Sequence, residues 1–161
     1  MNLSKKEIIF IAKFFILFFV LEMIIHLLPL VSFQNFIAQT QGLFFGVEFN
    51  KNLIFISDGV FEIVPSCTGL VSASVLFAII FSLKKPKIKE KFLIFLAGFV
   101  LLVLLNFLRI FFVVWTGIEF GIAIAEIVHI LSWFSTAIFV IGLWYYFTIK
   151  ITKEKSFSGF I

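Results

Sequence analysis

The stretch FLIFLAGFVLLVLLNFLRIFFVVW, residues 92–115, decides the fold class of this chain. Apart from Asn106 and Arg109, it contains only apolar residues and glycine. A helix needs about 20 predominantly apolar residues to cross the hydrocarbon core of a bilayer. The stretch therefore predicts a transmembrane helix rather than the core helix of a soluble protein.

Three further segments have the same character, at about 8–28, 66–83 and 125–149. The segment 66–83 is the shortest, since at ~1.5 Å per residue it reaches roughly 27 Å, just enough to span. Because 62% of the residues are hydrophobic and 26 are Phe, the composition excludes an ordinary soluble domain. We predict an all-α multi-pass membrane protein, with four transmembrane helices in a single domain over residues 1–161.

The first segment follows Lys5 and Lys6, as the apolar core of a signal peptide would. Its apolar run is longer than that of a usual signal peptide, and no small-residue cleavage site comes after it. We therefore expect it to be a retained membrane anchor.

Lysines separate the polar connections into two groups. They occur in the N-terminal tail, the loop 84–91 and the C-terminal tail 150–155, whereas the segments 29–65 and 116–124 hold only Lys51. Lysine-rich loops stay in the cytoplasm. We predict a cell-membrane protein with both termini cytoplasmic and with 29–65 and 116–124 extracytoplasmic. The net charge of +4 then reflects topology, and no nucleic-acid partner is expected.

The segment 29–65 ends in a run rich in Val, Ile and Phe, interrupted by the turn-like sequences FNKN and SDG. This pattern predicts short strands at about 43–49, 53–57 and 60–64, which form a small extracytoplasmic β hairpin or meander. The alternative is an irregular loop that lies along the membrane surface.

Charged and polar side chains inside membrane segments need an explanation, because a central charge costs roughly 2.5–3.5 kcal/mol on insertion scales. Arg109, the only arginine, precedes Trp115 by six residues and so lies about 9 Å below the outer helix end. His129 lies near the outer start of the fourth segment, and Cys67, the only cysteine, lies in the first turn of the second. The predicted topology thus brings residues of three helices to one depth.

A thiol, a fixed cation and an imidazole are the parts of a cysteine acyl-transfer site. Only the thiolate of Cys67 would be a good nucleophile, and Arg109 would stabilise the thiolate and a later oxyanion. His129 would act as general acid toward the leaving amine and as base toward the next nucleophile. We predict that these three residues are catalytic.

Three neighbouring residues are predicted to support this site. Asn106 precedes Arg109 by three residues and is expected to hydrogen-bond between helices or to support the arginine. Glu126 either orients His129 or faces the outer water. Gly69 would let another backbone approach the thiol closely.

Each catalytic candidate also has a purely structural interpretation. A lone cysteine can be a small packing residue, an arginine near a helix end can extend to the interface, and a histidine near an interface can be structural. The coincidence of the three at one depth favours function.

Metal and cofactor sites are not indicated. A single cysteine excludes an internal disulfide and a multi-cysteine metal site, and His26 and His129 are the only histidines. There is no glycine-rich phosphate loop. We expect no cofactor and no bound metal.

Three motifs together resemble the exosortase/archaeosortase family: NLIFISDGVFEIVPSCTGL at 52–70, NFLRI at 106–110 and AEIVH at 125–129. The shared pattern is a strand-like lead into Cys-x-Gly, an Asn-x-x-Arg on a later helix and a His on the next. The resemblance covers roughly residues 43–145. Many relatives carry extra helices or a second domain, so this chain resembles a compact core-only member.

The resemblance implies a membrane cysteine protease-transpeptidase. Its partners would be secreted proteins with a C-terminal sorting signal, made of a short motif, a transmembrane helix and a basic tail. The thiolate would attack a peptide carbonyl at the outer membrane face, and an acceptor would resolve the thioester. Membrane lipid is one candidate acceptor, with glycan and water as the others.

Two other functions fit the same residues. The chain could be a non-enzymatic membrane assembly or scaffold subunit, in which Asn106 and Arg109 hold helices together. It could also be a small carrier that binds an anion at Arg109. Retention of full activity by Cys67→Ser would exclude the thiol mechanism.

Overall fold

The computed structural model of the protein describes residues 4–153 together with 159 and 160. Lys155, one of the lysines behind the topology prediction, lies outside this part. In chain order the elements are α1 (Lys5–Leu27), α2 (Val31–Phe45), β1 (Phe49–Asn50), β2 (Leu53–Ile56), β3 (Gly59–Glu62), the 3-10 turn η1 (Pro65–Thr68), α3 (Leu70–Ser82), α4 (Ile88–Phe120) and α5 (Ile122–Thr152). The protein is thus mostly helical with one small antiparallel sheet, as predicted.

Three helices in the described residues, α1, α4 and α5, are long and apolar enough to cross a membrane. The fourth predicted span is not confirmed, because α3 has 13 residues and reaches only ~20 Å. It starts late because residues 65–68 form η1 and Gly69 follows with a φ of 83°. A left-handed residue interrupts the regular backbone, so the helix begins only at Leu70.

The predicted strand at 43–49 is wrong, since Leu43 to Phe45 complete helix α2 and only Phe49 enters β1. The buried face of α2 explains the error. It contains Gln34, Ile37, Ala38, Gln41 and Gly42, which recur at helical spacing. Two glutamines and a glycine in this stripe hide its periodicity from a search for apolar residues.

The strands at 53–57 and 60–64 are confirmed within one or two residues as β2 and β3. The sheet is an antiparallel meander in the order β1-β2-β3, and Leu53 pairs with Glu62 across β2 and β3. It packs on the end of the α4–α5 hairpin. A Cβ built on Gly117 of α4 would lie 2.6 Å from the Phe61 ring, so only glycine permits this contact.

The predicted loop at 116–124 is also wrong. Helix α4 continues to Phe120, and Gly121 alone, with a φ of 86°, separates it from α5. The backbone N–H of Ile122 donates to Asp58 Oδ2 at 3.0 Å, so the sheet satisfies one of the free donors at the start of α5.

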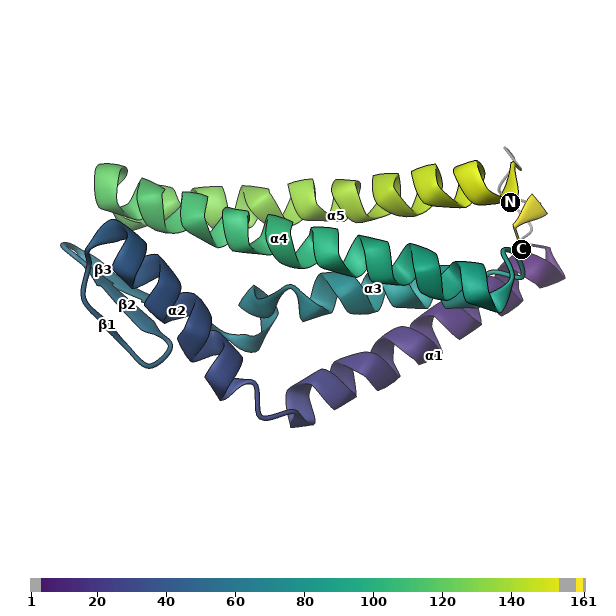
Figure 1. Ribbon diagram of the computed structural model, residues 1–161, viewed down its shortest axis with the longest axis horizontal. Coiled ribbons are helices and arrows are strands. Elements are labelled where there is room, and N and C mark those ends of the chain that lie inside the picture. The colour runs from purple at the N-terminus through teal and green to yellow at the C-terminus, as the bar shows by residue number, and fades with distance from the viewer. Residues whose placement is uncertain (1–3, 154–158, 161) are drawn as a thin grey trace.

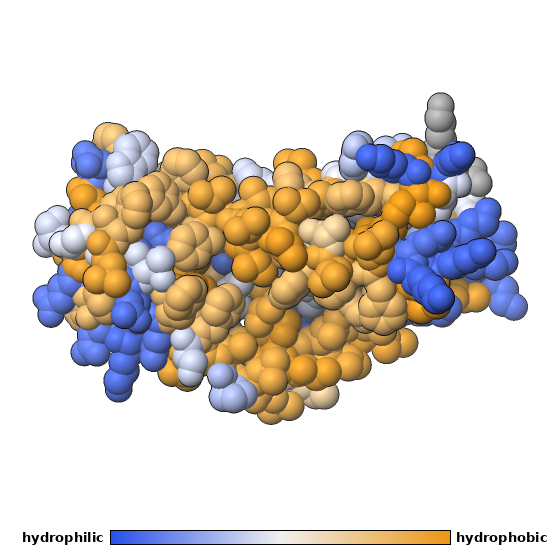
Figure 2. Space-filling model, viewed as in Figure 1, coloured by the Kyte–Doolittle hydropathy of each residue, from blue (hydrophilic) through white to orange (hydrophobic). Residues whose placement is uncertain are grey.

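Both described ends of the chain lie at one end of the molecule, and the sheet and α2 lie at the other (Figure 1). Between them Figure 2 shows an apolar band, with hydrophilic residues gathered toward the two ends. This distribution is typical of a protein that spans a bilayer.

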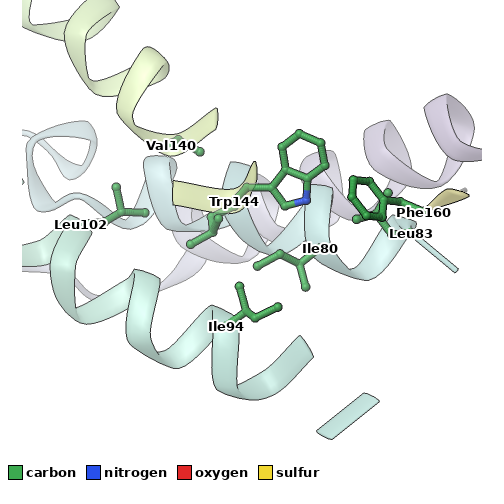
Figure 3. Close-up of a cluster of buried hydrophobic side chains, with 8 residues drawn as sticks. Ile80, Leu83, Ile94, Leu102, Val140, Trp144 and Phe160 are labelled. Carbon is green, nitrogen blue, oxygen red and sulfur yellow. The ribbon is translucent and has the colours of Figure 1, made fainter. Parts of the chain in front are cut away.

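Two clusters of buried residues hold the helices together. The first joins α3, α4 and α5 with Phe160 near the C-terminus, around Ile80, Leu102 and Trp144 (Figure 3). The second lies between α2, the sheet, η1 and α4, and it includes Ile54, Ile110 and the predicted nucleophile Cys67. The second cluster therefore positions the site.

Candidate functional site

Cys67 lies in η1, ahead of α3, and not in the first turn of a membrane helix as predicted. Its side chain is buried, and its backbone N–H donates to the Val64 carbonyl at 2.8 Å. The hydroxyl of Thr68 donates to the Pro65 carbonyl at 2.6 Å and closes the same turn. The thiol is thus held by a short turn that local hydrogen bonds make rigid.

Asn106 connects this turn to α4. Its Nδ2 donates to the carbonyl oxygen of Cys67, which fixes the backbone of the predicted nucleophile. A Cβ built on Gly69 would lie only 3.1 Å from Asn106 Cβ. The group that approaches closely at Gly69 is therefore the Asn106 side chain. This contact accounts for a glycine at position 69 without a substrate backbone beside the thiol.

Arg109 lies one turn beyond Asn106 on α4 and is only 8% exposed. Its guanidinium carbon is 5.0 Å from the ring centre of Trp133, a cation–π contact. Within the described residues, Nε and Nη2 are buried without a hydrogen-bond partner. Buried donors without partners are rare and costly, so these two are suited to a ligand that the protein binds.

Arg109 lies deeper than predicted. Since α4 extends to Phe120, the arginine is about 17 Å below the helix end instead of 9 Å. His129, on α5, lies about 10 Å from the start of that helix. The hairpin is longer than the sequence suggested, and the site lies correspondingly further inside the molecule.

His129 is half-buried, and its ring centre is 6.2 Å from that of Trp133. Glu126 is exposed and has no hydrogen bond to His129 among the described residues. Of the two roles considered for Glu126, the structure therefore favours the outward-facing one.

The three predicted catalytic residues line one cavity of about 50 Å³. Cys67 comes from η1, Arg109 from α4 and His129 from α5. The remaining walls are apolar residues of β3 and α4, together with Glu62. A thiol, a guanidinium and an imidazole therefore share one small and largely apolar space, in which electrostatic effects are strong.

Sequence reasoning missed two residues of this site. Glu62, at the end of β3, provides the one acidic side chain among the residues that line the cavity, and its Oε1 accepts from Asn52 Nδ2 at 3.3 Å. Trp133 lies against both the arginine and the histidine. Its spacing of four residues from His129 was a usable signal, whereas only the packing of the sheet on α4 reveals Glu62.

Arg109 also lines a second cavity, of about 320 Å³, between α4 and α5. That cavity is mainly apolar, with Ser132, Ser135 and Thr136 as its polar members. The arginine therefore borders both the small cavity and a groove between two membrane-spanning helices. In the described residues no group of three His, Cys, Asp or Glu side chains is placed to hold a metal ion.

Comparison with known proteins identifies the family of the chain. The family model described as Transmembrane exosortase (Exosortase_EpsH) matches residues 7–150. The chain is 32% identical over 119 residues to the "Probable archaeosortase E" of Methanocaldococcus jannaschii, an alignment that covers 70% of this chain and 61% of the relative. No solved structure matches. Because the family model covers most of the chain, this protein belongs to the transmembrane exosortase family.

Proposed function

We propose that this protein is a membrane-embedded cysteine protease-transpeptidase that removes C-terminal sorting signals from secreted proteins. One observation carries the proposal: Cys67, Arg109 and His129 come from three separate elements and line one cavity. Family membership and the archaeosortase name of a relative support the same reaction class. The chain spans 61% of that relative's length, so the relative's activity extends to it only as part of this proposal.

The first half of the reaction forms a thioester. The Cys67 thiol first gives its proton to His129. Sγ, as the thiolate, then attacks the carbonyl carbon of the scissile peptide bond, and a carbon–sulfur bond forms. The negative charge that develops on the carbonyl oxygen is stabilised by Nε and Nη2 of Arg109, the buried donors without partners. His129 then gives a proton to the leaving nitrogen as the carbon–nitrogen bond breaks. The C-terminal helix of the substrate departs with the new amine.

The second half transfers the acyl group. An acceptor hydroxyl or amine attacks the thioester carbon, and His129 removes its proton. The carbon–sulfur bond breaks and the Cys67 thiolate is restored. Membrane lipid, glycan and water remain the candidate acceptors. Glu62, on the wall that His129 shares, is proposed to stabilise the imidazolium form of His129, which is present beside the thiolate before the first half and again after the second.

The substrates proposed for this reaction carry a short motif, a transmembrane helix and a basic tail. The lysine distribution supports an orientation with both termini in the cytoplasm and the sheet outside. A basic substrate tail would then remain cytoplasmic while the scissile bond lies near the outer face. The groove between α4 and α5, which Arg109 also lines, offers a side opening toward the membrane.

The decisive experiment combines a tagged host protein bearing such a tail with Cys67→Ser and Cys67→Ala variants of this protein. We expect the wild type to shorten the tagged protein and to release a hydroxamate when hydroxylamine is added, because hydroxylamine captures thioesters. Both variants should do neither while inserting into the membrane normally.

Full processing by Cys67→Ser would exclude the thiol mechanism and favour the scaffold alternative. Ser72→Ala, on α3 and outside the cavity that contains the thiol, is a matched control that should process normally.

A further inference from the structure

A further apolar cavity, formed by described residues, is distinct from the proposed catalytic cavity. It is a groove of about 480 Å³ between α1 and α5, with α3 beneath it. We call it the α1–α5 groove. Its lining is almost entirely apolar and includes Phe14, Val75, Ala137, Val140 and Trp144. An apolar groove that opens on the side of a membrane protein faces lipid chains.

A basic pocket of about 230 Å³ continues this groove toward the end of the molecule where the termini lie. Lys6, Lys13 and Lys84 line the pocket, and Phe10 lines both the pocket and the groove. Lys6, Phe10 and Lys13 recur on one face of α1, since they are spaced by four and three residues. The two cavities therefore form one continuous feature, apolar along its length and cationic at its end.

Lys13 is the informative member of this pocket. It is the one charged residue between Ile8 and Leu21 of a helix that is otherwise apolar there. A charge inside a membrane segment is costly unless it reaches the interface or meets a partner. No carboxylate pairs with Lys6, Lys13 or Lys84 in the described part of the chain. The buried Lys91 nearby, by contrast, donates to the Leu83 carbonyl.

We propose that this feature is a binding site for an anionic membrane lipid. The phosphate-bearing headgroup is held by Lys6, Lys13 and Lys84, and one hydrocarbon chain lies in the α1–α5 groove. Three cations that no carboxylate among the described residues pairs with, at the mouth of an apolar groove, match the two halves of such a molecule.

The dimensions of the groove favour a lipid chain over a protein helix. From Trp133 to Trp144 the groove follows α5 for about 16 Å, close to half of a ~30 Å hydrocarbon core. A transmembrane helix needs about 20 residues, or ~30 Å, to cross the core, which is about twice the length of this groove. The basic tail of a proposed substrate would moreover be repelled by the three lysines.

This lipid is not the proposed acyl acceptor. Its headgroup lies at the end of the molecule that carries the termini, whereas the sheet and the catalytic cavity beneath it lie toward the opposite end (Figure 1). The inference therefore concerns a separate site, and it does not depend on the proposed reaction.

Trp144 allows a direct test, because it lines the groove. The full chain carrying Trp115→Phe and Trp133→Phe keeps Trp144 as its single tryptophan. It is reconstituted in phosphatidylcholine vesicles with increasing fractions of chain-brominated phosphatidylglycerol or chain-brominated phosphatidylcholine. We expect brominated phosphatidylglycerol to reach half-maximal quenching at a fraction about tenfold lower than brominated phosphatidylcholine does. Equal quenching by the two lipids would overturn the proposal.

Two variants separate the headgroup from the chain. Lys6→Gln, Lys13→Gln and Lys84→Gln together should abolish the preference, whereas Lys5→Gln, Lys87→Gln and Lys89→Gln, outside the pocket, should keep it. Ala137→Phe fills the groove and should reduce quenching by the anionic lipid while all lysines remain. Undiminished quenching in Ala137→Phe, or displacement of the lipid by a lysine-flanked polyleucine transmembrane peptide, would contradict a lipid-chain site.

Discussion

At the scale of single residues, the guanidinium of Arg109 is the most constrained group in the candidate site. It stacks on Trp133, is almost fully buried and has two nitrogens without hydrogen-bond partners in the described residues. Lysine carries the same charge but lacks the planar fork and the stacking surface. The identity of the residue should therefore matter as much as its charge.

We predict that Arg109→Lys lowers the processing rate by about 100-fold, the effect typical of losing one oxyanion donor. The measurement is the initial rate of substrate shortening in membranes with equal amounts of each variant. A rate within threefold of the wild type would remove Arg109 from the oxyanion role. Trp133→Phe, which keeps an aromatic face, should retain much more activity.

Asn106 is predicted to act through Cys67 rather than on the substrate, since its Nδ2 donates to the Cys67 carbonyl. Asn106→Leu keeps a similar volume but leaves this buried carbonyl without its donor, which costs about 1–3 kcal/mol. We expect kcat to fall while KM stays nearly constant, because the nucleophile is misplaced and binding contacts remain. An increase in KM alone would indicate a substrate contact.

At the scale of elements, the turn that carries Cys67 depends on Gly69, which combines a left-handed backbone with contact against α4. We predict that Gly69→Ala destabilises the protein by about 1–2 kcal/mol from backbone strain, with a further loss from the Asn106 contact. Thermal unfolding in detergent measures this effect. Gly142→Ala is the matched control, because Gly142 is helical, exposed and has nothing within 4 Å of its added Cβ. It should be neutral or slightly stabilising.

The elements also show which patterns in the sequence were sufficient. Continuous apolar runs predicted α1, α4 and α5, because the bilayer requires length and hydrophobicity that can be read directly. Helix α2 was missed because Gln34 and Gln41 face inward, and each has a side-chain nitrogen that reaches a backbone carbonyl, of Ile63 and Phe107 respectively. Such a stripe looks polar in sequence and is buried in the fold.

The candidate site was predictable to a similar degree. The lysines of the loops predict in which direction each segment crosses the membrane. These directions predict that Cys67, Arg109 and His129 lie at one depth, and the three residues do line one cavity. Their chemical roles stay predictions. Glu62 could not be found in this way, because it reaches the cavity through docking of the sheet on α4, a contact between distant segments.

At the scale of the whole molecule, the apolar band between two polar ends sets the plane of the membrane but not its direction (Figure 2). The lysine distribution predicts the direction. In a Cys67→Ser background, we expect a membrane-impermeant maleimide added to intact cells to label Ser57→Cys, an exposed position beside the sheet. Lys89→Cys should be labelled only after permeabilisation. The reverse pattern would invert the proposed orientation.

The single residue between α4 and α5 has a mechanical consequence. Because Gly121 is the whole connection, the two helices cannot rotate independently about their axes. The directions in which Arg109 and His129 point are therefore fixed relative to each other. One residue inserted between Gly121 and His129 would turn the imidazole by about 100° around the axis of α5 and shift it by ~1.5 Å. The spacing between these two residues is therefore as much a part of the site as the side chains themselves.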